Sequence, residues 1–205
     1  MPNLLIKIIK FIWLFVRELV YLLKFLVMVN NSVFEKALIF AVKKHKGQTR
    51  KGNKLSYIIH PMRVAVLLQS IKESKNIPLL MTVSLLHDTA EDCGVKLSTI
   101  ARLFGHAVAS LVEELTLDKR KYETLGKTEY LCQEVLKMSS YALCIKLCDR
   151  LDNVRDMKNM SESFRSKYRA ETREILNRLK GRKLTKTHTK LIKLIEKEIN
   201  VKKAA

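Results

Sequence analysis

The sequence predicts an all-α protein, and two observations support this fold class. Apolar residues recur every three or four positions through most of the chain, which is the period of an α-helix with one buried face. No alternating strand pattern is longer than a few residues, and neither internal repeats nor a glycine-rich phosphate loop is present. A chain of 205 residues has room for one domain with a real core and one appendage. We therefore expect a helical bundle with an extra helix at the amino terminus.

The extra helix is predicted over residues 4–29, which are intensely apolar. Within it Lys7, Lys10, Arg17 and Lys24 recur on one stripe. No uncharged run reaches the roughly 18 residues of a spanning helix, and no cleavage site of a secretory signal follows. This pattern favours an amphipathic helix lying on an anionic membrane surface. The alternatives are a tilted span with snorkelling lysines, a helix docked on a partner chain, and a start site placed too far upstream.

The main helical domain is predicted to begin after the break at residues 30–32. Ser32 and Glu35 form a capping box that opens the first helix, which ends near Gly47. A polar loop over residues 48–54 follows, and Pro61 suits the start of the next helix. We divide the chain into three parts: a membrane-associating helix (1–30), the main domain (31–180) and a basic carboxyl-terminal helix (181–205).

The most informative helix is predicted over residues 78–93, between Pro78 and Gly94. Its sequence is mostly apolar, yet it contains four ionisable residues within little more than one turn, namely His87, Asp88, Glu91 and Asp92. Burying such groups without partners costs several kcal/mol or more, and metal coordination is one of the few ways to satisfy them. We therefore interpret this segment as a site.

Further helices are predicted over residues 98–104, 106–116, 129–138, 141–157, 164–179 and 191–199, whereas residues 117–127 read as a charged loop. The helix over 141–157 has a polar stripe at Asp149, Asn153 and Asp156 on an otherwise core-forming surface. Ser139 and Ser140 are suited to cap its amino terminus.

Two imidazoles and two carboxylates are available for one metal site, from His60, His87, Asp88 and Asp149. This mixture of nitrogen and oxygen donors suits Mn²⁺, Fe²⁺ or Zn²⁺. A metal lowers the pKa of a bound water to near neutrality, which permits attack on phosphorus. Glu91 and Asp92 are placed to orient or deprotonate that water.

Five motifs in order along the chain resemble the hydrolase domain of RelA/SpoT homologues, a branch of the HD phosphohydrolase superfamily. They span about residues 33–178 and read His45-x-Gly47-Gln48-x-Arg50-Lys51-Gly52, Tyr57-Ile58-x-His60-Pro61, Leu85-Leu86-His87-Asp88-Thr89-x-Glu91-Asp92, Phe104-Gly105 and Lys146-Leu147-x-Asp149-Arg150-Leu151-x-Asn153. The resemblance implies an HD-domain bundle that removes the 3′-pyrophosphate from ppGpp or pppGpp, giving GDP or GTP and pyrophosphate. Within that branch, the sequence resembles the small alarmone hydrolases, which belong to the stringent response.

The resemblance also implies a role for individual residues. One Mn²⁺ ion would be held by His60, His87, Asp88 and Asp149, with Glu91 and Asp92 managing the attacking water. Substrate contacts would come from four residues: Arg50 and Lys51 near the guanine, Asn153 at the ribose or a phosphate, and Tyr57 beside the His60 loop.

Three positions depart from the long enzymes of the family. Alanine, histidine and threonine are usual at the positions of Cys148, Asp152 and Asp156. An aspartate at position 156 is similar to the small hydrolases of the family. The stretch after Leu179 is too short for a synthetase domain, so we expect degradation of alarmone and not its synthesis. Two alternatives stay open: a phosphohydrolase acting on another nucleotide, and a catalytically silent module that binds alarmone or a partner at the membrane.

The formal net charge of +19 favours polyanionic partners. A guanosine polyphosphate and an anionic membrane both fit, whereas nucleic acid is not expected because the basic tail contains no groove-reading motif. The four cysteines include no C-x-x-C pair and read as structural thiols of a reduced compartment. We expect a cytoplasmic protein, associated with the inner face of the membrane if residues 4–29 bind there.

Overall fold

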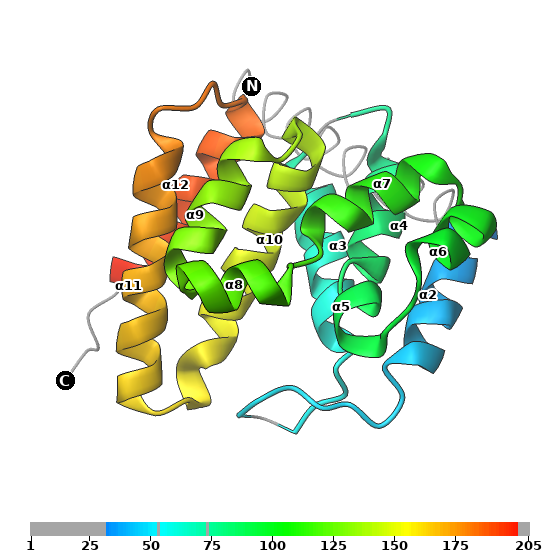
Figure 1. The fold of residues 1–205 in the computed structure, drawn as a ribbon, viewed down its shortest axis with the longest axis horizontal. Helices are drawn as coiled ribbons and strands as arrows, with labels where there is room; N and C mark the ends of the chain where they lie inside the picture. Colours follow the sequence, from blue (N-terminus) through cyan, green and yellow to red (C-terminus); the bar gives the residue numbers. More distant parts are fainter. Residues whose placement is uncertain (1–31, 53, 73, 201–205) are drawn as a thin grey trace, which may run out of the picture.

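The computed structural model describes residues 32–52, 54–72 and 74–200, and within these ranges the fold is helical (Figure 1). A single isolated bridge between Thr49 and Ser56 is the one β-type pairing there. The all-α prediction is confirmed. The helices are α2 (Ser32–Lys44), α3 (Ile59–Ile71), α4 (Ile77–Leu86), α5 (Thr89–Cys93), α6 (Leu97–Phe104), α7 (His106–Leu115), α8 (Lys119–Leu125), α9 (Lys127–Lys137), α10 (Ser140–Asp156), α11 (Glu162–Leu179) and α12 (Lys186–Asn200), with a short 3₁₀ helix η1 (Met157–Asn159) after α10.

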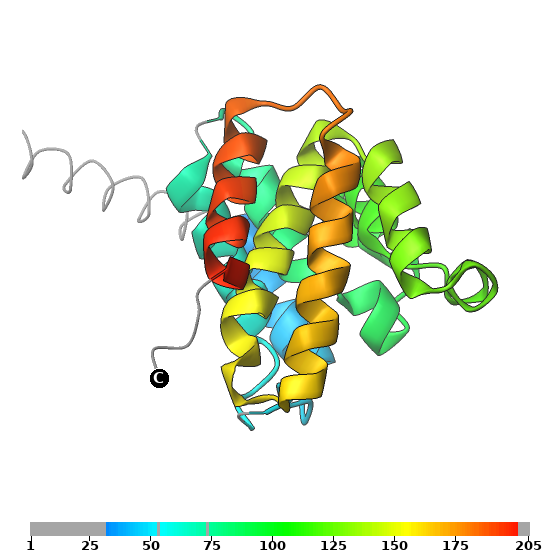
Figure 2. The ribbon, with the colours of Figure 1, turned by 90° about the vertical axis from the view of Figure 1, so that its left-hand side faces the viewer.

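Helix α10 is the centre of the bundle. It packs against α3 and α7 on one side and against α11 and α12 on the other, and Figure 2 shows α12, α10 and α11 side by side. The Ser139 hydroxyl accepts a hydrogen bond from the Ala142 N–H at 3.2 Å, which confirms the predicted cap at its amino terminus. A central helix covered on several sides holds any polar side chain on it in a fixed position.

Helix α4 is the most deeply buried element, because its sequence is apolar on every side. Every residue from Leu80 to Leu86 is buried, including Thr82 and Ser84, whose hydroxyls donate to carbonyls one turn earlier. Helices α2, α3 and α7 cover it. The end of this rigid helix is therefore a precise support for the residues that follow.

The single helix predicted over residues 78–93 is wrong, because the chain breaks at His87 and Asp88 into α4 and α5. Two side-chain donors lie at the break. The His87 ring nitrogen Nδ1 lies 2.7 Å from the Ser84 carbonyl oxygen, and the Thr89 hydroxyl donates to the Leu86 carbonyl at 2.7 Å. In a continuous helix those carbonyls would accept from backbone N–H groups instead. Gly94, at φ +65°, ends α5 as predicted.

The charged loop predicted over residues 117–127 is also wrong in part, because it contains the short helix α8. The Asp118 carboxylate caps this helix by accepting from the Arg120 N–H at 3.1 Å, and Gly126 at φ +78° ends it. Residues 120–125 are all exposed, so α8 has no buried face and its sequence shows no periodicity. The other predicted helices occur with ends shifted by a few residues.

The carboxyl-terminal helix α12 is part of the same core as the rest of the bundle. Its Leu191, Ile195 and Ile199 are buried in one hydrophobic cluster with residues of α10. The helix predicted over residues 4–29 lies outside the described residues, and the division of the chain near residues 30 and 180 stays a prediction. Among the described helices, none has both the length and the apolar character that crossing a bilayer requires.

Candidate metal and phosphate site

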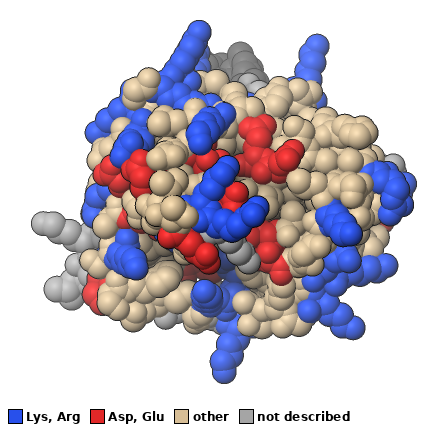
Figure 3. All heavy atoms as spheres, viewed as in Figure 1, with Lys and Arg blue, Asp and Glu red and all other residues tan. Residues whose placement is uncertain are grey.

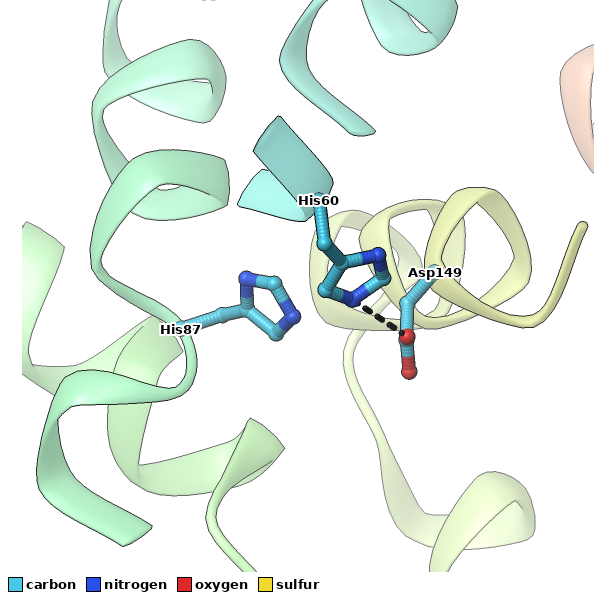
Figure 4. Close-up of side chains that lie close together, drawn as sticks. All are labelled: His60, His87 and Asp149. Carbon is cyan, nitrogen blue, oxygen red and sulfur yellow. Dashed lines mark ion pairs between the residues drawn. The ribbon is translucent and has the colours of Figure 1, made fainter. Parts of the chain in front are cut away.

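Three buried side chains from three separate elements point toward one another (Figure 4). His60 comes from the first turn of α3, His87 from the turn after α4, and Asp149 from the middle of α10. One donor atom of each lies within 4.8 Å of the other two, and His60 Nε2 is 3.1 Å from Asp149 Oδ1. This is the spacing of ligands around a single metal ion.

Asp88 completes the predicted set of four. Its Oδ2 lies 3.0 Å from His87 Nε2 and 3.8 Å from His60 Nε2. His87 and Asp88 are adjacent in the chain and project in different directions, yet both reach the same place beside His60. The structure thus brings together all four residues that the sequence indicated as metal ligands.

The orientation of both histidines is fixed from behind. His87 Nδ1 faces the Ser84 carbonyl, which can only accept, so this nitrogen carries a proton and Nε2 is the nitrogen that points toward the other donors. His60 Nδ1 lies 2.7 Å from Asp152 Oδ2, and Arg63 holds the other oxygen of that carboxylate at 2.7 Å. Carboxylates and carbonyls behind a histidine are the usual support of metal-binding imidazoles.

Charges in the cluster are strongly coupled. Burial lowers the pKa of His60, but its bonds to Asp149 and Asp152 outweigh that effect and raise the pKa to about 9. Burial opposes the charge of Asp149, yet Lys146, with Nζ at 3.1 Å, and His60 hold its pKa well below the usual range. Asp149 is therefore ionised, and a cation could take the place of the proton on His60.

The residues fit a divalent metal ion. The His87 Nε2 atom is buried and faces the other donors, with Asp88 Oδ2 at 3.0 Å. Buried imidazoles and carboxylates that converge in this way are costly unless a shared cation compensates them, and a metal ion would do so. Mixed imidazole and carboxylate donors suit Mn²⁺, Fe²⁺ or Zn²⁺, and they do not select among these ions.

Tyr57 contacts the cluster through its hydroxyl, which donates to Asp88 Oδ2 at 2.7 Å. Burial and the nearby Asp88 charge raise the pKa of Tyr57, so the hydroxyl keeps its proton. Its ring stacks on His45 at 4.8 Å and meets His60 edge-on at 5.9 Å. Tyr57 thus positions Asp88 as well as the His60 turn.

Arg50 is anchored beside Asp149 by two residues of α10. Its Nη2 donates to Asn153 Oδ1 at 2.7 Å, and its Nε pairs with Asp156 Oδ2 at 3.0 Å. Asn153 Nδ2 in turn donates to Asp149 Oδ1 at 2.5 Å. The guanidinium of a loop residue is thereby connected to the cluster through hydrogen bonds, with the exposed Lys51 next to it.

Glu91 and Asp92 lie on α5, one turn beyond His87 and Asp88, and both line the same cavity as His60, Asp88 and Asp149. Glu91 is half-buried and Oε2 accepts from the Leu117 N–H at 3.2 Å. Burial raises the pKa of Glu91 above its ordinary value. Asp92 is exposed.

The cavity has a volume of about 400 Å³ and is lined by residues of the loop before α3 and of α3, α5, α9, α10 and α11. In Figure 3, acidic and basic side chains are crowded together at the middle of the face that Figure 1 presents. The cavity wall also contains aromatic and sulfur-containing side chains, namely those of Met157, Met160, Phe164 and Tyr168. A cavity with this size and mixed charge suits a phosphorylated small molecule.

Sequence reasoning missed three residues of this site. Asp152 and Arg63 form the support behind His60, and Lys146 pairs with Asp149. Asp152 was noted only as a departure from the family pattern. The i, i+3 spacing of His60 to Arg63 and of Asp149 to Asp152 was the available signal, because it puts each pair on one helix face.

The profile of the HD domain family matches residues 37–185 of this chain. A GTP pyrophosphokinase rsh from Brucella melitensis is 32% identical over 160 residues, which cover 75% of this chain and 21% of that protein. A GTP pyrophosphokinase from Streptomyces coelicolor is 36% identical over 144 residues, covering 69% and 16%. The chain therefore spans about a fifth of the length of the curated relatives it matches.

Two solved structures have the same architecture. A metazoan orthologue of SpoT that hydrolyses ppGpp and plays a role in starvation responses superposes with a TM-score of 0.69 at 27% identity, covering 82% of this chain and 96% of that one. A protein from Listeria monocytogenes superposes with a TM-score of 0.55 at 20% identity over 70% of this chain and 98% of that one, which shows the fold alone.

This chain belongs to the HD domain family. Within that family, the relatives and the SpoT orthologue confirm the resemblance to RelA/SpoT homologues that the sequence motifs indicated.

Proposed function

We propose that this protein hydrolyses the 3′-pyrophosphate of ppGpp and pppGpp, giving GDP or GTP and pyrophosphate, with one Mn²⁺ ion. The observation that carries the proposal is the convergence of His60, His87, Asp88 and Asp149 at one cavity of an HD domain. The likeness to a SpoT orthologue that hydrolyses ppGpp supports the choice of substrate.

In this reaction a water oxygen bonds to the phosphorus next to the ribose, and the bond from that phosphorus to the 3′-oxygen breaks. A divalent ion bound by the four donors would lower the pKa of a coordinated water and polarise the phosphate. Glu91 is suited to take the proton of the water, since burial raises its pKa toward the range of an effective base. Asp92 would orient the water, and the proton ends on the 3′-oxygen.

The substrate would be held by the loop between α2 and α3 and by α10. The Arg50 guanidinium, held by Asn153 and Asp156, presents a flat cation suited to stacking on guanine. Lys51 is an exposed point charge for a phosphate. Asn153 would contact the ribose or a neighbouring phosphate, and Tyr57 would keep Asp88 in place.

The test is Mn²⁺-dependent turnover of ppGpp by the full chain, with separate measurement of free phosphate and pyrophosphate. We expect pyrophosphate release, and a drop of at least about 100-fold for His87→Ala and for Asp149→Ala because each removes a ligand. His106→Ala is the matched control, since this histidine is exposed on α7 and should keep native activity.

Two outcomes would contradict the proposal in different ways. Release of free phosphate from other nucleotides, with none from ppGpp, would make the protein a phosphohydrolase of another substrate. Binding of ppGpp without turnover in Mn²⁺ would make it a catalytically silent binding module.

A further inference from the structure

Asp149 divides the cavity into two sides, because its two carboxylate oxygens face different partners. Oδ1 accepts from Asn153, which is joined to Arg50, and these residues lie toward the carboxyl end of α10. Oδ2 pairs with Lys146, one turn toward the amino end. If the nucleoside lies on the Arg50 side of Asp149, the part of the substrate beyond the scissile phosphate lies on the Lys146 side.

The Lys146 side contains further cations that the proposed reaction has not used. Lys146, Arg150 and Lys127 all line the cavity here, although Lys127 comes from a different helix, α9. Arg150 lies over the Tyr168 ring, with its guanidinium carbon 4.7 Å from the ring centre, and Lys127 Nζ is 6.0 Å from the same centre. Arg150 and Lys127 therefore lie against one aromatic wall of the cavity, and Lys146 lines the cavity beside Asp149.

Two of these cations, Arg150 and Lys127, share one acidic partner, Glu171. Glu171 is buried, and Arg150 Nη1 already pairs with its Oε1 at 2.7 Å. Lys127 Nζ is 3.3 Å from the other oxygen, yet 44% of the Lys127 side chain is exposed. One carboxylate thus serves two cations, so the ammonium of Lys127 can accept a second anionic partner without leaving Glu171 unpaired. Lys127 is also the first residue of α9, where the helix dipole adds partial positive charge.

We propose that Lys127 binds the terminal phosphate of the 3′-pyrophosphate and makes the site select a pyrophosphate over a single phosphate at that position. This rests on the proposed function, since it assumes that the nucleoside lies on the Arg50 side. The second phosphate of the pyrophosphate then lies beyond the four donors, on the side of Lys127 and Lys146. Lys127 acts here as a specificity residue that touches substrate away from the reacting phosphorus.

The experiment is calorimetric titration of the Mn²⁺-loaded full chain with each product separately, inorganic pyrophosphate and GDP. Lys127→Gln should weaken pyrophosphate binding about 5- to 10-fold, because it removes one partly exposed charge-assisted contact, and leave GDP binding unchanged. Lys127→Arg should retain most of the pyrophosphate affinity. Lys137→Gln is the matched control, since this exposed lysine lies at the other end of α9, and it should change neither affinity.

Two outcomes would overturn the assignment. Weaker binding of GDP with unchanged pyrophosphate would place Lys127 at the 5′-diphosphate, and unchanged binding of both products would remove it from the site. These titrations need no turnover, so they are read independently of the ppGpp assay. Failure of the proposed function appears as absent pyrophosphate release by the native chain, whatever Lys127→Gln does to product binding.

Discussion

At the scale of single residues, His60 is held between two carboxylates with different functions. Asp149 lies beside the Nε2 atom of His60, on the side of the other donors. Asp152 lies on the opposite side of the ring, beside Nδ1, and is itself held by Arg63. The imidazole can therefore neither rotate nor change the nitrogen that it presents. Such a support is expected to govern metal affinity without contacting the metal.

Replacing Asp152 by alanine should weaken Mn²⁺ binding by roughly 10- to 100-fold, because the His60 ring loses the carboxylate that orients it. Asp152→Asn should lose less, since the amide oxygen can still accept from Nδ1. Titration of Mn²⁺ into the apo protein measures this directly, with Glu123→Ala on the exposed helix α8 as control. Equal affinity in the native protein and Asp152→Ala would show that His60 needs no such support.

The residues that the sequence revealed and those that it did not differ in a physical way. His87, Asp88 and Asp149 stand out in the sequence because ionisable groups on otherwise apolar helices need a partner, whereas His60 is indicated by the family motif that contains it. Asp152 and Arg63 satisfy each other and His60 through three-dimensional contacts between α3 and α10. Nothing in the linear sequence indicates that pairing beyond their helical spacing.

At the scale of elements, the contact between α12 and α10 depends on a buried neutral histidine. His188 Nε2 lies 2.9 Å from the Ser140 carbonyl at the start of α10, and its Nδ1 accepts from the Thr185 N–H at 3.2 Å. Both nitrogens are thus committed, and a second proton would displace the Thr185 bond. Burial, together with the charges of Arg182 and Lys72, lowers the pKa of His188 despite the bond to Ser140.

The free energy of unfolding should therefore contain a contribution from His188 that is present at neutral pH and lost on acidification. The unfolded chain binds a proton to this residue near pH 6.5, whereas the folded chain does so only at lower pH, so stability falls as the pH drops below about 6.5. Urea unfolding of the native protein and of His188→Gln at pH 7.5 and 5.5 measures it. The difference between the two proteins should shrink at pH 5.5, and an equal difference at both values would contradict the assignment.

The helices could be predicted where they have one buried face. The prediction failed where a helix has no buried face or where side chains interrupt it. Helices α7, α9, α10, α11 and α12 follow their apolar periodicity. Helix α8 is exposed all round and gives no periodic signal. The break after α4 depends on His87 and Thr89 taking carbonyls of the preceding turn, a competition that apolar patterning does not reveal.

At the scale of the whole molecule, we propose that residues 4–29 bring the basic protein to an anionic bilayer. The stripe of Lys and Arg in that segment and the net charge of +19 support this. The full chain should float with vesicles containing an anionic lipid, should float less at high salt, and should not float once residues 1–29 are deleted. Unchanged flotation of the shortened chain would remove this segment from membrane binding.

The position of α12 has a practical consequence for anyone preparing a shorter fragment. The matched family region ends at residue 185, one residue before this helix begins. A fragment cut there would expose to water the flank of α10 that Leu191, Ile195 and Ile199 now cover. The free energy of unfolding would lose roughly 1.5–3 kcal/mol for each of these buried side chains. The smallest unit suited to crystallisation or to a kinetic assay therefore extends to residue 200.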